Sequence, residues 1–141
     1  MDLLLMMEGR RFTLFSLLIG DSVPAFLAYM KTENQMEFDR MNRRLEQLAE
    51  RGASRRRDEF NHLGDGLYEA KTKGGGRVIF FYDRNNIVIC AAGFSKQSRR
   101  TPKQVLDTAR SRRTAYEKHK RANGVFNIQV PESRKIPERR P

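Results

Sequence analysis

Basic side chains crowd the middle of this sequence, at positions where strand faces and turns should leave them open to solvent. Within residues 63–104 they include Lys71, Lys73, Arg77, Lys96, Arg99 and Arg100. Lysine and arginine carry positive charge and several N–H donors, and the oxygens of a phosphate group bind both. The chemistry that this segment predicts is therefore the binding of a polyanion.

The net charge of the whole chain favours the same kind of ligand. The 141 residues include 28 Lys and Arg against 17 Asp and Glu, which gives a net charge of +11. Such an excess attracts nucleic acid, anionic membrane or acidic protein, and a surface that is basic only for solubility is the plain alternative. With 38% hydrophobic residues, the chain has the length and composition of one globular domain.

The cysteine and histidine residues of the chain do not indicate a disulfide, a reactive thiol or a metal site. Cys90 is the one cysteine and lies in the apolar run 87–92, where we expect a buried, inert thiol. His62 and His119 lie far apart among charged neighbours, and no CxxC pair occurs. We therefore expect no disulfide, no metal and no other cofactor.

The start of the chain does not have the pattern of a targeting signal. Residues 1–11 contain a short apolar run that follows Asp2 and precedes basic residues, which is the reverse of a secretory signal. No run approaches the ~18 apolar residues of a membrane span. These features predict a cytoplasmic protein that does not enter a membrane.

The helices that must position the basic residues are predicted from capping residues and apolar spacing. Residues 11–18 predict a strand. A helix should follow with Ser22 as its cap, and a second should begin near Thr32, whose spacing to Gln35 forms a capping box. A third helix should begin with Thr101 as its N-cap, because a proline and a glutamine follow at the expected spacing.

Three strands are predicted at residues 67–73, 77–82 and 87–92. In the first strand, alternation places one set of side chains on a charged, open face: Glu69, Lys71 and Lys73. Only tight turns join the three strands, so they should form an antiparallel meander.

Together these elements predict an α+β fold. We expect a small antiparallel sheet, made of the three-strand meander plus the N-terminal strand, with two N-terminal helices on one face and a C-terminal helix. Residues 1–123 should form the domain. Residues 124–141 hold three of the five prolines and should form a flexible tail.

The chain resembles a known family at several short motifs. They are residues 21–27 (DSVPAFL), 63–69 (LGDGLYE), the aromatic strand that starts at Arg77, 93–96 (GFSK) and 101–104 (TPKQ). Over residues 11–115 the sequence is similar to the RelE/ParE toxin superfamily, and most closely to its phage-type HigB-like branch. This resemblance implies a small α+β toxin with a cognate antitoxin. RelE- and HigB-like members cut mRNA bound in the ribosome, whereas ParE-like members poison DNA gyrase.

Cleavage of RNA at a 2′-hydroxyl requires two proton transfers and stabilisation of extra negative charge. Histidine often performs the proton transfers, but no histidine is suitably placed here. RelE-like toxins rely instead on clustered Lys and Arg, whose mutual repulsion lowers a lysine pKa and whose charge stabilises the transition state.

By this resemblance, Lys71 is the proton shuttle, and Arg77 and Lys96 are phosphate clamps. Glu69 stands where the family has a basic residue, and acts as a general base or screens its neighbours. The tyrosine that some relatives carry near the last helix has no clear equivalent. Further phosphate anchors are expected at Lys73, Arg55, Arg56, Arg57, Arg99 and Arg100.

A structural explanation exists for each of these residues. Lys71 and Lys73 are also what the solvated face of a strand would carry, and Arg77 beside three glycines is also what would close a turn. The predicted function is a metal-independent, ribosome-dependent mRNA endoribonuclease, the toxin of a type II toxin–antitoxin system. The alternatives are a ParE-like inhibitor of DNA gyrase and a non-catalytic nucleic-acid-binding module.

Overall fold

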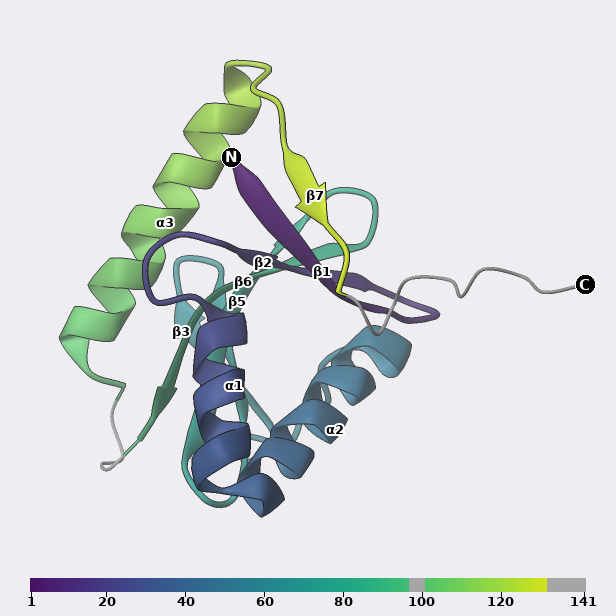
Figure 1. Ribbon diagram of the computed structural model, residues 1–141, viewed down its shortest axis with the longest axis vertical. Coiled ribbons are helices and arrows are strands. Elements are labelled where there is room, and N and C mark those ends of the chain that lie inside the picture. Colours follow the sequence, from purple (N-terminus) through teal and green to yellow (C-terminus); the bar gives the residue numbers. More distant parts are fainter. Residues whose placement is uncertain (97–100, 132–141) are drawn as a thin grey trace, which may run out of the picture.

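The structure is a computed structural model and describes residues 1–96 and 101–131. Within these ranges the chain forms three helices and one seven-stranded mixed sheet (Figure 1). The elements are β1 (Asp2–Glu8), β2 (Thr13–Leu17), α1 (Val23–Glu33), α2 (Gln35–Arg51), β3 (Phe60–Gly64), β4 (Leu67–Lys71), β5 (Gly76–Asp83), β6 (Ile87–Ser95), α3 (Lys103–Arg121) and β7 (Asn127–Gln129).

The predicted sheet was wrong in both size and strand direction. The observed strand order is β3-β4-β5-β6-β2-β1-β7. Two neighbouring pairs, β2 with β6 and β1 with β7, are parallel, and the other pairs are antiparallel. The predicted N-terminal strand (residues 11–18) corresponds to β2, which lies in the interior of the sheet between β6 and β1. A parallel pair needs a long connection, and α1, α2 and β3–β5 supply it between β2 and β6.

The strands absent from the prediction carry weak local signals. β1 (DLLLMME) is a nearly continuous apolar run, and its pairing with β2 includes an irregularity between Leu5 and Met7. β3 follows a basic connector and has only Phe60 fully buried. β7 has three residues and starts the segment that was predicted to be a tail. Residues 132–141 of that predicted tail lie outside the described residues.

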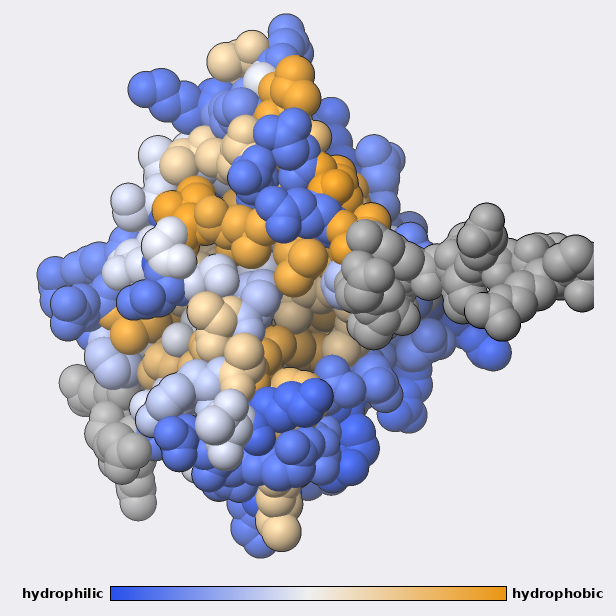
Figure 2. All heavy atoms as spheres, in the orientation of Figure 1, coloured by the Kyte–Doolittle hydropathy of each residue, from blue (hydrophilic) through white to orange (hydrophobic). Residues whose placement is uncertain are grey.

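Apolar residues pack on both faces of the sheet, and β5 shows how. Val78 and Phe80 point toward α1 and α2, whereas Ile79 and Phe81 point toward α3. On the first face, α2 buries a stripe that includes Met41 and Leu45 at helical spacing. Figure 2 shows that the surface over α2 is hydrophilic and that apolar side chains gather over β1 and β7.

The start of the second helix differs from its prediction. Asn34 caps α2 through its side-chain oxygen, which accepts from the backbone N–H of Glu37 at 3.2 Å. Thr32 still belongs to α1, and its hydroxyl donates to the carbonyl of Ala28. None of the helices within residues 1–96 and 101–131 is long and apolar enough to cross a membrane.

Candidate active site

The turns of the meander bring basic residues from β4, β5 and β6 to one end of the sheet. Lys71 and Arg77 are direct cross-strand partners, and Arg77 in turn pairs with Phe94 of β6. Glu69 lies two residues before Lys71 and therefore shares its face of the sheet, the face that α3 covers. Lys96 follows β6 directly. We call Glu69, Lys71, Arg77 and Lys96 the β4–β6 site.

Lys96 lies within electrostatic range of the other three residues of this site. Burial lowers the pKa of its ammonium group below the usual value, and the charges of Arg77 and Lys71 lower the pKa further, while Glu69 opposes them. The fold thus brings Lys71, Arg77 and Lys96 to the same end of the sheet, with Glu69 close enough to act on the charges of Arg77 and Lys96.

The guanidinium of Arg77 is held by the turn that precedes it. Its Nη1 donates to the carbonyl oxygens of Thr72 at 2.9 Å and Gly76 at 2.8 Å. Burial lowers the pKa of Arg77, against the effect of Glu69 and Glu37. Its Nε is buried and has no hydrogen-bond partner among the described residues. A buried donor without an acceptor costs stability.

Lys71 lies on the β3 side of the site. Its Nζ donates to the carbonyl of Arg57 at 2.9 Å, and its backbone carbonyl accepts from Nε of Arg44, also at 2.9 Å. The connector that contains Arg57 and the helix α2 therefore fix the end of β4. For Lys71 to reach a substrate, its ammonium group must leave the carbonyl of Arg57.

Glu69 is buried, and its partner explains why the third helix starts later than predicted. The hydroxyl of Thr101 donates to Oε2 of Glu69 at 3.0 Å, and only 1% of Glu69 is exposed. A buried carboxylate requires a donor, so Thr101 serves Glu69 instead of capping the helix. α3 begins at Lys103, with Pro102 at the N-cap and no capping by a described side chain.

Glu37, a residue that the sequence analysis did not single out, anchors the turn next to the site. Its carboxylate is buried on α2 and accepts hydrogen bonds from the Thr72 hydroxyl, from the N–H of Gly76 at 3.3 Å and from Nη1 of Arg40 at 3.3 Å. Burial alone would raise the pKa of Glu37, but these donors outweigh it and hold the pKa below the usual value.

The glycines of this turn fit between Glu37 and Lys96. A Cβ at Gly74 would collide with the carboxylate of Glu37. Gly75 has a φ of 98°, its carbonyl accepts from the N–H of Lys96 at 2.7 Å, and a Cβ there would lie 2.8 Å from the Lys96 carbonyl. The turn thus couples α2 to both Arg77 and Lys96. The pattern Asn34-x-x-Glu37, typical of a helix start, is the signal that could have drawn attention to Glu37.

Comparison with known proteins bears on the same region. The sequence profile of the family described as phage derived protein Gp49-like (DUF891) matches residues 26–114, more than half of the chain. The chain belongs to this family. Gp49-like proteins are RelE-like toxins. No curated protein matches the sequence significantly.

The Gp49-like span contains the whole β4–β6 site. It runs from α1 into α3 and includes Glu37 and the glycine turn, whereas β1, β2 and β7 lie outside it. The family match and the cluster of cations therefore fall on the same elements.

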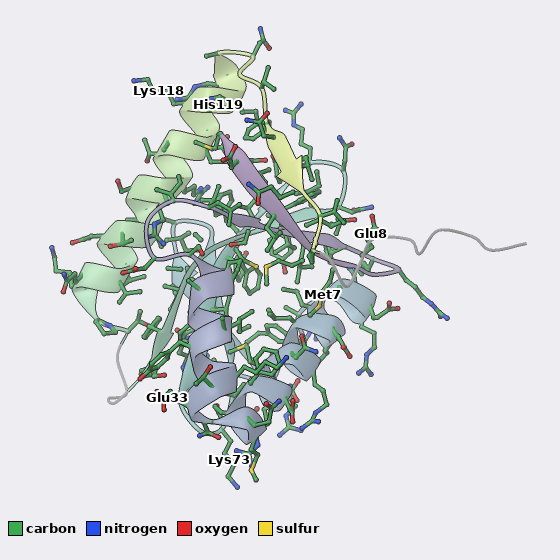
Figure 3. All side chains as sticks on the ribbon, viewed as in Figure 1. Met7, Glu8, Glu33, Lys73, Lys118 and His119 are labelled. Carbon is green, nitrogen blue, oxygen red and sulfur yellow. The ribbon has the colours of Figure 1, made fainter. Side chains whose placement is uncertain are left out.

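The predicted phosphate anchors lie around this site with different surroundings. Lys73 is exposed in the turn after β4, at the end of the molecule where α1 meets α2 (Figure 3). Arg55 and Arg57 are exposed in the connector before β3, and Arg56 there donates to both carboxylate oxygens of Asp58, at 3.2 and 2.9 Å. Arg99 and Arg100 lie outside the described residues.

Among residues 1–96 and 101–131, no group of three or more His, Cys, Asp or Glu side chains is arranged to hold a metal ion. Cys90 is fully buried, and burial raises its thiol pKa to about 12, as expected for an inert thiol.

Proposed function

We propose that this Gp49-like protein is the toxin of a type II toxin–antitoxin pair, and that it cleaves mRNA on the ribosome without a metal ion. The observation that supports this most is the placement of Lys71, Arg77 and Lys96 at one end of the sheet, where the charges of Lys71 and Arg77 act on Lys96. We further assign the chain to the HigB-like branch, on its motifs at residues 63–69, 93–96 and 101–104.

The proposed reaction needs the charges that this site supplies. The 2′-oxygen of one nucleotide attacks the adjacent phosphorus and loses its proton, the bond to the 5′-oxygen breaks, and that oxygen takes up a proton. Arg77 holds the phosphate and stabilises its extra negative charge. Lys71 is the proposed proton shuttle. Lys96 clamps the phosphate and, because its pKa is lowered, is a second candidate for proton transfer.

The remaining assignments follow from the same proposal. A cytoplasmic location is proposed because ribosomes are the target. A cognate protein antitoxin is the proposed partner, and it would silence the toxin by covering the basic end of the sheet. Lys73 and the arginines at 55–57, 99 and 100 would hold neighbouring phosphates.

The test is to express the protein and to map RNA ends on translating ribosomes. Wild type should arrest growth and produce new 5′-hydroxyl ends, and the triple variant Lys71→Ala, Arg77→Ala, Lys96→Ala should do neither. Growth arrest that survives the triple substitution would refute the nuclease. A supercoiling assay on the same proteins would then reveal a gyrase inhibitor, and absence of any arrest would leave a non-catalytic binding module.

A further inference from the structure

A second basic depression lies beside the glycine turn, on the far side of Thr72 from the β4–β6 site. It has a volume of about 280 Å³, ample for a phosphodiester group. We call it the α2 pocket, and its lining residues are Arg40, Arg43, Arg44, Gln47, Thr72 and Lys73. None of the α2 residues among them was predicted as part of a binding site.

The spacing along α2 explains why this pocket is so basic. Positions 40, 43, 44 and 47 recur every three or four residues, so their side chains lie on one face of the helix. That face borders the turn after β4, which adds Lys73. Cations from two elements distant in sequence therefore surround one depression.

Two of the four cations are anchored by carboxylates and two are not. Arg40 pairs with Glu37 at 3.3 Å, and Arg44 pairs with Glu59 at 3.3 Å. Arg43 and Lys73 are exposed and have no ion pair or side-chain hydrogen bond with any residue in the described ranges. The anchored arginines form a fixed wall, and the two unpaired cations leave an excess of positive charge that an anion would neutralise.

The α2 pocket borders the end of β4 that carries Lys71. Arg44, which lines the pocket, donates to the carbonyl of Lys71 at 2.9 Å. Thr72 and Lys73 follow Lys71 directly in the chain. A nucleic-acid strand with one phosphate at Arg77 would therefore pass this end of the sheet on its way to α2.

We propose that the α2 pocket binds a backbone phosphate of the RNA strand at a distance from the bond that is cleaved. This inference rests on the proposed function for the identity of the strand. It adds a contact that holds the RNA in place without taking part in the chemistry.

The probe for the test is a single-stranded 2′-O-methyl RNA oligonucleotide, which binds but lacks the attacking hydroxyl. Each phosphate contact to a single strand contributes about 0.7 to the slope of log affinity against log salt. The double variant Arg43→Ser, Lys73→Ser should therefore bind more weakly and, because the pocket holds one phosphate, with a slope shallower by about 0.7. Both side chains are exposed, so thermal melting should show an unchanged fold.

The matched control removes one arginine and one lysine elsewhere. Arg84 in the β5–β6 turn and Lys118 on α3 are exposed and have no described side-chain partner. Figure 3 places Lys118 at the opposite end of the molecule from Lys73. Arg84→Ser, Lys118→Ser should leave the slope as in the wild type. Equal slopes for the two double variants would overturn the proposal.

Other outcomes separate this proposal from the proposed function. If the wild type cleaves no RNA but the α2 pocket variant loses slope, the nuclease is refuted and the pocket stands. If cleavage occurs and the slope does not change, the pocket is refuted and the nuclease stands. Duplex DNA bound as tightly as the oligonucleotide, with the same loss of slope, would overturn RNA as the ligand.

Discussion

The ammonium group of Lys96 is the clearest case of a side chain whose chemistry is set by its neighbours. Burial and two nearby cations lower its pKa, and one carboxylate partly compensates. A lysine with a lowered pKa exchanges its proton closer to neutral pH. Replacing a charged neighbour of Lys96 should therefore shift the pH dependence of the reaction.

The first prediction concerns Arg77→Gln. Because the charge of Arg77 lowers the pKa of Lys96, its removal should raise that pKa and move the corresponding limb of the pH–rate profile to higher pH. The measurement is single-turnover cleavage on programmed ribosomes across pH. The rate will also fall, since Arg77 is the proposed clamp, but the position of the limb is independent of its height.

Lys73→Gln is the control for this prediction. It removes an exposed cation that is not among the groups acting on Lys96, so the limb should keep its position. A limb that stays in place in Arg77→Gln as well would show that Lys96 does not titrate in the reaction.

At the residue scale, short sequence motifs predict those site residues that lie close to one another in the chain. The motifs around Lys71, Arg77 and Lys96 suggested a common site, and short turns bring these residues to one end of the sheet. Glu37 could not be found in this way. Its partners Thr72 and Gly76 lie 35 and 39 residues further along the chain, and no local pattern reports such a contact.

Among the elements, α2 and the glycine turn are coupled through one buried carboxylate. In the folded state the pKa of Glu37 lies below its usual value, so its ionised form favours folding. This contribution is present above the unfolded pKa of about 4.3 and is lost as pH falls through the lower folded value.

The second prediction is that Glu37→Gln destabilises the protein by about 1–2 kcal/mol at pH 7, because charge-assisted hydrogen bonds become neutral ones. The difference from wild type should shrink as pH falls below about 4. Urea unfolding of both proteins between pH 3 and pH 7 measures this difference in the free energy of unfolding. Glu33→Gln is the control, since Glu33 is exposed and has no described side-chain partner. A difference that is constant with pH would contradict the coupling.

The third prediction uses two glycines with nearly the same backbone conformation. Gly75 has a φ of 98° and Gly64 a φ of 96°, but only at Gly75 would a Cβ meet a neighbour, the Lys96 carbonyl. Both alanine variants should lose about 1 kcal/mol or more to backbone strain. Gly75→Ala should lose more stability and also slow cleavage, because the Lys96 backbone must shift. Equal losses, with unchanged cleavage, would show that the turn does not position Lys96.

The presence of a helix was predicted well where the spacing of apolar residues defines it. The first residue of a helix was predicted poorly where more than one residue could act as the cap. The stripe of Met41, Leu45 and Leu48 predicted α2, and these side chains are buried. The predicted caps at Thr32 and Thr101 were wrong, because another acceptor or cap was available in the folded chain. Thr101 in particular serves a carboxylate on β4.

For the whole molecule, the segment after α3 is attached both by the aromatic side chain of Phe126 and by strand pairing. Phe126 packs against Tyr116, with ring centroids 5.2 Å apart, and against His119 at 4.8 Å, while β7 pairs with β1. Its neighbour Val125 is 72% exposed. The two positions thus provide a partly buried and an exposed substitution side by side.

The fourth prediction is that Phe126→Ala lowers the free energy of unfolding by about 2 kcal/mol, because a partly buried aromatic group loses its contacts. Val125→Ala should change it by less than about 0.5 kcal/mol. Cleavage by both variants should equal the wild type, since the β4–β6 site is on other strands. Chemical unfolding and single-turnover cleavage test this. Equal stabilities would show that the segment is not docked in solution.

The overall sheet was the part least accessible to sequence patterns. Tight turns identify neighbours such as β5 and β6, but nothing local indicates that β2 lies parallel to β6 or that β7 lies parallel to β1. Such pairings depend on the global arrangement of apolar faces, and long connections leave several arrangements open.

The place of β7 beside β1 has a consequence for biosynthesis. More than a hundred residues separate the two strands, so during translation β1 exists for many elongation steps before residues 127–129 are made. Throughout that interval the outer backbone donors and acceptors of β1, whose own sequence includes Leu3, Leu4 and Leu5, can pair with a strand of another nascent chain. The edge of β1 is therefore covered against self-association only when β7 has been synthesised.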